Sequence, residues 1–293
     1  MSIGKQLYGM AEGLLWALVV GLSRLPFGVL YLFSDLCFLV VYYLIPYRKR
    51  LVLTNLRNSF PEKSEAEIQS IAKRFYHHLT DLLVESLKLF SISDKEAQER
   101  IKIVGMEQYT GFFEKKIQWI VATGHYGNWE WLACMPNRLL YEVMSLYKPL
   151  HNKMLDRITL KSRTRFGAIM VPSHDAVRDV ANRVRSGKLS IMCFIADQSP
   201  KKSMIQYRTT FLNQDTPVYL GIEKLARKYA TGVCFIWLDK VGRGRYEIKV
   251  KVLTEDASQL APYEVTERYM KAMEDVIREK PEYWLWTHRR WKY

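Results

Sequence analysis

The chain has 293 residues, of which 44 are Lys or Arg and 30 are Asp or Glu, so its formal net charge is +14. With 48% hydrophobic and 25% charged residues, the composition excludes a disordered or low-complexity chain and permits a sizeable core. The excess of positive charge predicts an acidic partner, which could be nucleic acid, an anionic membrane, or an acidic or phosphorylated substrate carrier.

Two apolar segments stand at the start of the chain, over residues 10–22 and 28–47. The second has only Ser34 and Asp35 as clearly polar members. A helix of its 20 residues would be about 30 Å long, which is the thickness of a bilayer core. Asp35 argues against a simple spanning helix, because an acid at mid-bilayer costs about 2.5–3.5 kcal/mol on insertion scales.

A basic run over residues 48–50 follows the second apolar segment directly. By the positive-inside rule, it places the remainder of the chain on the cytoplasmic side of a membrane. The mean hydropathy of −0.16 excludes a polytopic transporter but permits one anchor. We therefore predict that residues 1–50 form a membrane anchor that either spans the bilayer or lies in its interface. The alternative is a buried core helix.

A long helix is predicted next. Ser64 and Glu67 have the spacing of a capping box, and apolar residues recur at helical intervals from Ile68 to about Phe90. His77 and His78 within this helix are adjacent and point to different faces, so they make a poor metal-binding pair.

From residue 118 onward, short apolar runs alternate with amphipathic segments. The predicted strands are 118–123, 142–146, 168–171, 190–196, 233–238 and 246–253. The predicted helices are 129–139, 153–165, 175–185, 217–229 and 264–279. Residues 242–244 read Gly-Arg-Gly and predict a hairpin turn. This alternation predicts that residues 51–293 form one α/β domain, with a mixed sheet flanked by helices.

One segment has the pattern of an active site. His125 follows a buried-type strand, and Glu130 falls in the first turn of the helix predicted after it. Catalytic groups collect at the carboxyl ends of strands in open α/β sheets. Gly127 would let the chain fold back, so that Glu130 contacts one ring nitrogen of His125 and the other nitrogen accepts a proton from a hydroxyl. The alternative is a structural His/Glu pair.

Several other active-site signatures are absent from the sequence. It has no GxxxxGK[ST] loop, no GxSxG elbow, no HExxH motif and no GxGxxG after a strand. The four cysteines form no CxxC pair, which excludes a disulfide scaffold and a cysteine-type zinc site. We expect no bound metal. We also expect no nucleic-acid partner, because no binding module is recognised and the cations are spread along the chain.

The segment Thr123-Gly124-His125-Tyr126-Gly127-Asn128-Trp129-Glu130 resembles the H-x(4)-D/E motif of the bacterial lipid A late acyltransferases, which are lauroyl and myristoyl transferases. Two further segments match this family, Ala196-Asp197-Gln198 and the closing run 281–291. Motif order, length and the apolar start also fit, so the resemblance covers essentially the whole chain. In the wider superfamily, which includes glycerolphosphate acyltransferases, the acid is usually Asp, whereas this chain has Glu130.

This resemblance implies a glycerolphosphate acyltransferase-like fold and a mechanism. His125 would act as general base on a hydroxyl of a lipid A precursor, and Glu130 would orient it. The hydroxyl would attack an acyl thioester of acyl carrier protein or coenzyme A, with no other cofactor. The protein would lie at the bacterial inner membrane, with its catalytic domain on the cytoplasmic face. Acceptor alternatives are a lysophospholipid or an aminoacyl lipid, and a non-catalytic basic membrane scaffold is the alternative from another class.

Substrate-binding residues are also implied. An Arg before Phe166-Gly167 is expected to bind substrate, and of Arg163 and Arg165 we favour Arg163. Asp197, at a strand end, is expected to line the pocket, with a turn or cap residue as the alternative. The cations gather in four groups, expected to meet a phosphorylated lipid, an anionic membrane and an acidic carrier: 48–50, 148–165, 201–208 and 289–292.

Overall fold

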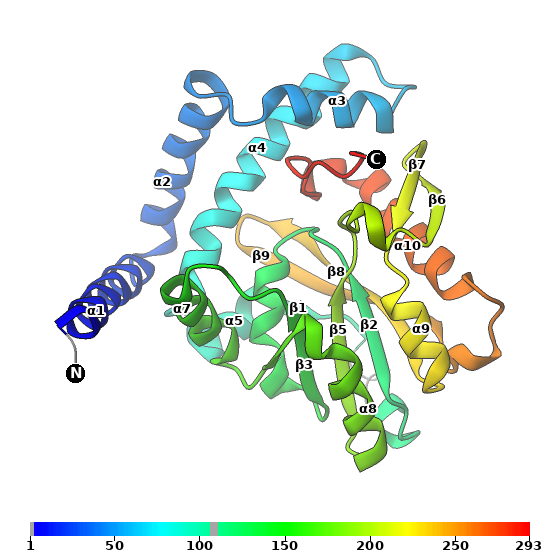
Figure 1. Cartoon of the computed structure of the whole chain (residues 1–293). Coiled ribbons are helices and arrows are strands. Elements are labelled where there is room, and N and C mark those ends of the chain that lie inside the picture. Colours follow the sequence, from blue (N-terminus) through cyan, green and yellow to red (C-terminus); the bar gives the residue numbers. More distant parts are fainter. Residues whose placement is uncertain (1–2, 106–110) are drawn as a thin grey trace.

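The computed structural model describes residues 3–105 and 111–293, and Figure 1 shows a central sheet surrounded by helices. Seven strands form this sheet in the order β1-β9-β8-β2-β5-β3-β4. Neighbouring strands are parallel, except for β8 and β9, which are antiparallel. The predicted α/β class, with a mixed sheet flanked by helices, is confirmed.

The strands of this sheet are β1 (Ile101–Ile103), β2 (Trp119–Thr123), β3 (Glu142–Tyr147), β4 (Ile169–Pro172), β5 (Ser190–Ile195), β8 (Gly232–Gly242) and β9 (Arg245–Thr254). A separate antiparallel pair consists of β6 (Tyr207–Phe211) and β7 (Gln214–Val218). The α-helices are α1 (Ile3–Ser23), α2 (Phe27–Leu39), α3 (Lys49–Ser59), α4 (Glu65–Lys88), α5 (Asp94–Arg100), α7 (Lys153–Thr164), α8 (Ala176–Ser186), α9 (Gly221–Lys228) and α10 (Glu264–Glu279). A π-helical turn, Val40–Leu44, extends α2.

Local sequence signals account for several of these elements. The Ser64 hydroxyl accepts from the backbone N–H of Glu67, and the Glu67 carboxylate accepts from the backbone N–H of Ser64, so the predicted capping box starts α4. The Gly242–Gly244 turn joins β8 to β9 as a hairpin, as expected. Helix α10 has the predicted bounds.

Two predicted helices differ from the structure. Residues 129–139 form two 3₁₀ turns, η2 (Trp129–Cys134) and η3 (Pro136–Arg138), instead of one α-helix. Pro136 explains the break between the two turns, because it has no N–H to continue the helical hydrogen bonding. The helix predicted from residue 217 begins at Gly221, because residues 214–218 form β7.

Alternate residues of β2 face opposite sides of the sheet, as strand geometry requires. Ile120 and Ala122 point into the main core, which also contains side chains of α4, α9 and α10. Trp119 and Val121 point the other way, into a smaller apolar cluster with Tyr141. This second side of the sheet is the side on which the candidate site lies.

Helix α2 has apolar side chains on both of its sides, one of which is buried and the other exposed. Leu30, Ser34, Phe38 and Tyr42 recur every four residues and are buried, and α2 lies along α4 in Figure 1. The other side exposes large apolar side chains: Val29, Leu32, Phe33, Leu36, Leu39, Val40, Tyr43 and Leu44. Within the described residues, Phe27–Leu44 is the one helix that is long and apolar enough to cross a membrane, by length and composition. The membrane anchor remains a prediction.

Candidate active site

The loop after β2 is held in place from two sides. The Thr123 hydroxyl at its start donates to the Ile236 carbonyl at 2.9 Å. Gly127 has a φ of +59°, and a Cβ at this position would overlap the carbonyl oxygen of Leu238. Only glycine therefore fits where the loop passes β8. From the other side, the Gly127 N–H donates to the Tyr283 carbonyl at 3.0 Å, in the C-terminal segment.

His125 in this loop is paired with Asp197. The His125 Nδ1 lies 2.7 Å from Oδ1 of Asp197, and the His125 backbone N–H donates to Oδ2 at 2.9 Å. Sheet register explains the pairing, because β2 and β5 are parallel and Thr123 lies opposite Ile195. His125 and Asp197 each lie two residues beyond these strand ends, so they meet at the same edge of the sheet. The His125 side chain is 17% exposed and that of Asp197 is 2% exposed.

The two groups shift each other's ionisation. Burial disfavours the charged form of Asp197, but the His125 ring and the hydrogen bonds from His125 and Trp284 outweigh burial and lower its pKa to about 2. The Trp284 Nε1–H donates to Asp197 Oδ2 at 2.9 Å. Burial also disfavours the charged His125 ring, but the Asp197 carboxylate outweighs burial and raises the pKa of His125. The pair therefore favours a protonated His125 ring beside an ionised Asp197 carboxylate.

The second ring nitrogen of His125 is the chemically useful one. A neutral ring that donates its Nδ1–H to Asp197 keeps a lone pair on Nε2. The side-chain nitrogen of Gln198 lies 3.2 Å from this Nε2 and could donate to it. The Trp129 ring stands edge-on to the imidazole, with 4.9 Å between ring centroids. An Nε2 with this environment can accept a proton from a hydroxyl.

Glu130 does not contact His125, so the expected contact between them is wrong. Its carboxylate instead accepts from Arg163 at both oxygens, at 3.0 Å from Nε and 2.6 Å from Nη2. The Trp129 Nε1–H also donates to it at 3.2 Å. Glu130 lies in the 3₁₀ turn η2 and its side chain meets Arg163 of α7. The prediction had placed Glu130 in the first turn of an α-helix. Asp197, 72 residues away in sequence, takes the place beside His125 that we expected for Glu130.

Arg163 and Arg165 point to different places. Arg163 lies at the cavity described below, together with Glu130. The Arg165 guanidinium donates to the carbonyls of Leu89 and Ile92, where α4 ends, and does not line the cavity. Of the two arginines, Arg163 lies at this cavity and Arg165 does not, and substrate binding by either residue stays a prediction.

An apolar cavity of about 140 Å³ lies on the second side of the sheet. Side chains of β2, β3, β5, β8 and β9 line it, including Trp119, Val121, Val143, Ile191, Ile236 and Val250. Glu130, Arg163 and Thr123 are among its few polar lining residues. Trp119 and Thr123 are the two ends of β2, roughly 13 Å apart at the rise of a strand. Asp197 does not line this cavity and lies behind His125, and its expected contact with substrate stays a prediction.

The C-terminal segment packs against the His125–Asp197 pair on the side of Asp197. It forms a 3₁₀ turn, Pro281–Tyr283, and an isolated bridge between Trp284 and Tyr126. Trp284 and Trp286 are buried and contact each other at 4.8 Å between centroids. Trp284 thus both packs the core and holds Asp197.

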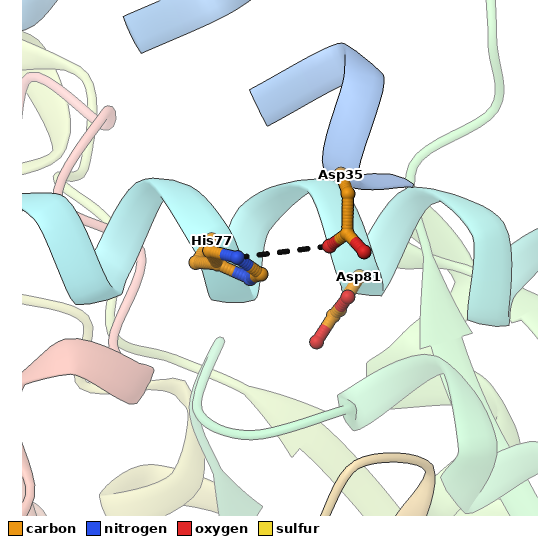
Figure 2. Close-up of side chains that lie close together, drawn as sticks. All are labelled: Asp35, His77 and Asp81. Carbon is orange, nitrogen blue, oxygen red and sulfur yellow. Dashed lines mark ion pairs between the residues drawn. The ribbon is translucent and has the colours of Figure 1, made fainter. Parts of the chain in front are cut away.

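A second cluster of titratable groups joins α2 to α4. Figure 2 shows Asp35 of α2 beside His77 and Asp81 of α4, and the dashed line marks the 3.6 Å pair between Asp35 and His77. Their potential ligand atoms lie within 4.8 Å of one another. Arg243 contacts both carboxylates, and Lys240 lies 3.0 Å from Asp81. Because these cations already compensate the acids, we interpret the cluster as a contact between helices.

A histidine held by a carboxylate is a candidate general base, and an apolar cavity nearby can bind an apolar substrate group. The model of the bacterial lipid A biosynthesis acyltransferase family matches residues 7–293, and the chain belongs to this family. The family resemblance and the acyltransferase class predicted from sequence are confirmed.

Individual relatives are more distant in sequence. The chain is 23% identical over 284 residues to the lipid A biosynthesis lauroyltransferase of Escherichia coli (strain K12), covering 96% of this chain and 89% of that protein. It is 21% identical over 287 residues to the lipid A biosynthesis palmitoleoyltransferase of Escherichia coli (strain K12) and to the lipid A biosynthesis acyltransferase of Shigella flexneri, with the same coverage.

Sequence reasoning missed the roles of two residues. Asp197 was expected to line the pocket, not to pair with His125, and Trp284 was noted only as part of the closing run 281–291 that matches the family. The signal for Asp197 was present, because it follows a strand by the same two residues as His125 does. The strand order that makes β2 and β5 neighbours was needed to use that signal.

Proposed function

We propose that this protein is a membrane-anchored O-acyltransferase that moves a fatty acyl chain from a thioester to a hydroxyl of a lipid A precursor, with His125 as general base. The observation that carries this proposal is the His125–Asp197 pair, in which the ring nitrogen Nδ1 lies 2.7 Å from the carboxylate, in the loop whose Trp129 and Glu130 line the apolar cavity. Membership of the acyltransferase family supports it.

In this mechanism, no covalent acyl-enzyme forms. His125 Nε2 takes the proton of the acceptor hydroxyl while the hydroxyl oxygen attacks the thioester carbonyl carbon. Asp197 stabilises the imidazolium that results, and it does so without becoming protonated. The tetrahedral intermediate then collapses, the carbon–sulfur bond breaks, and the imidazolium returns the proton to the leaving sulfur.

The cavity is the proposed site of the acyl chain. Its lining is mostly apolar, so it can bury methylene groups that contribute about 0.8 kcal/mol each. Glu130 acts through Arg163 in this proposal, since two hydrogen bonds fix the guanidinium at the cavity. There the cation can meet an anionic substrate group or the charge that develops on the carbonyl oxygen.

The proposed location is the cytoplasmic face of the bacterial inner membrane. The exposed apolar side of α2 supports membrane attachment, and the exposed Arg48 and Arg50 beside it would meet anionic headgroups. The surplus of positive charge also suits an acidic donor, for which we propose acyl carrier protein ahead of coenzyme A. Added salt is then expected to weaken both contacts.

The test is acyl transfer by a His125→Ala variant in membranes. We expect transfer to a lipid A precursor to fall by at least about a hundredfold, because the general base is lost. His174→Ala is the matched control, since the His174 side chain is 71% exposed and pairs only with Asp175 among the described residues. Mass spectrometry of the lipids would identify the acyl chain and the acceptor. Unchanged transfer by His125→Ala would refute the mechanism, and transfer to a lysophospholipid alone would refute the acceptor.

A further inference from the structure

Glu85 of α4 is fully buried and accepts hydrogen bonds from three different parts of the chain. The Tyr31 hydroxyl of α2 donates to it at 2.9 Å, and the Tyr246 hydroxyl of β9 donates at 2.7 Å. The third donor is the Asn128 side-chain nitrogen, at 2.8 Å. One carboxylate group therefore connects α2, the sheet and the loop after β2.

Asn128 places this contact within the candidate active site. It lies between His125 and Glu130 in sequence, and its side chain is fully buried. Helix α4 makes two more contacts to the same stretch. The Glu85 carbonyl accepts from Trp131 Nε1 at 2.8 Å, and His78 Nε2 lies 3.3 Å from the Gly127 carbonyl.

From this geometry we infer that Glu85 is a positioning residue for acyl transfer: it fixes the loop that carries His125 and Glu130 and ties that loop to α2. This inference rests on the proposed function for its effect on the reaction. Its effect on the loop itself can be measured independently.

Three donors reach the two oxygens of residue 85. Asn128 and Tyr246 donate to one oxygen, and Tyr31 donates to the other. A glutamine has one acceptor oxygen and one NH₂ group, and the Tyr31 hydroxyl can accept as well as donate. A glutamine at this position can therefore keep its oxygen on Asn128 and Tyr246 and donate its NH₂ group to Tyr31. Glu85→Leu instead removes both acceptor oxygens and leaves the Asn128 side chain as a buried donor with no acceptor at residue 85.

The experiment compares four variants of the full chain in membranes. Glu85→Leu removes the acceptor for Asn128, and Asn128→Asp places two carboxylates against each other. The E85Q/N128D double variant restores one donor and one acceptor, with their positions exchanged. Ser34→Ala is the control, because the Ser34 hydroxyl contacts Asp81 and Thr80 of α4 but not the loop.

For Glu85→Leu and Asn128→Asp, we expect kcat to fall between about tenfold and a hundredfold, because small displacements of a catalytic group have effects of this size. The KM for the acyl thioester should change less than kcat, since the strands supply most of the cavity lining. The E85Q/N128D variant should recover at least about a third of the wild-type kcat, a rescue that a purely structural loss would not give. Ser34→Ala should retain kcat.

Hydrogen–deuterium exchange of the peptide covering 125–131 gives a readout that needs no substrate. We expect faster exchange in both single variants and wild-type exchange in the double variant and in Ser34→Ala. Unchanged kcat and exchange in Glu85→Leu would overturn the inference, and so would equal losses in all four variants. If the wild-type protein transfers no acyl group, the proposed function fails, and the exchange measurement still decides whether Glu85 positions the loop.

Discussion

Asp197→Asn is the most direct test of how the site holds its base. The substitution removes one buried charge and keeps the shape of the side chain. An asparagine oxygen can replace only one of the two carboxylate oxygens, which together receive hydrogen bonds from His125 Nδ1, the His125 backbone and Trp284. The backbone and Trp284 donors share Oδ2, so the amide oxygen is expected there.

The NH₂ group of the asparagine then faces His125 Nδ1. The ring can accept from that group only if Nδ1 loses its proton, which moves the proton to Nε2. A protonated Nε2 has no lone pair for the substrate hydroxyl. We therefore expect kcat to fall by about 10²–10⁴-fold, the usual range for loss of a general base, with a smaller change in KM.

The same variant should change the dependence on pH. Asp197 raises the pKa of His125, so the rate in the wild-type protein should increase as pH rises through that raised value and the ring becomes neutral. Without the carboxylate, burial and the Arg163 cation lower the pKa of the ring against the smaller effect of Glu130, so the rising limb should move to lower pH. A pH–rate profile for both proteins measures this shift.

Stability should change in a defined pH window. The pKa of Asp197 is lowered from 3.8 to about 2, and its stabilising effect is therefore present above pH 3.8 and is lost as pH falls through about 2. A shift of this size corresponds to about 2 kcal/mol at neutral pH. Thermal unfolding at pH 7 should show the loss in Asp197→Asn, and the difference should vanish near pH 2. A kcat within tenfold of wild type and an unmoved limb would refute the role of Asp197.

Three further changes test the loop, the cavity and the anchor. Gly127→Ala should abolish transfer and lower Tm. Gly187 has a similar positive φ but open space around it, so Gly187→Ala should lower the free energy of unfolding by only about 1 kcal/mol. Equal losses of Tm in the two variants would contradict the close approach to β8. Val121→Trp should narrow the cavity and shorten the transferred acyl chain, and mass spectrometry showing an unchanged chain length would move the acyl site elsewhere. Leu36→Asp should reduce sedimentation with anionic vesicles at least about tenfold relative to Val177→Asp. Val177 is an exposed apolar residue on α8 and serves as the control. Equal binding by the two variants would exclude the exposed side of α2 as the membrane contact.

Much of the fold followed from local patterns. The capping box before α4, the hairpin at 242–244 and the periodicity of α10 each depend on residues close together in sequence, and each was predicted with little error. The β6–β7 hairpin was missed. Its turn has Leu212 and Asn213 at positive φ, and Leu gives no sequence signal for such a turn.

The sequence by itself determined the family, the α/β class and the position of the candidate base at the end of β2, because motif spacing and strand patterns are local properties. Only the tertiary structure decided which carboxylate supports His125. Asp197 and Glu130 are both acids near strand or helix ends, and Glu130 is far closer in the chain. The parallel register of β2 with β5 brings Asp197 to the ring, while η2 directs Glu130 to Arg163. Contacts between distant segments depend on strand order, which no local pattern in the chain specifies.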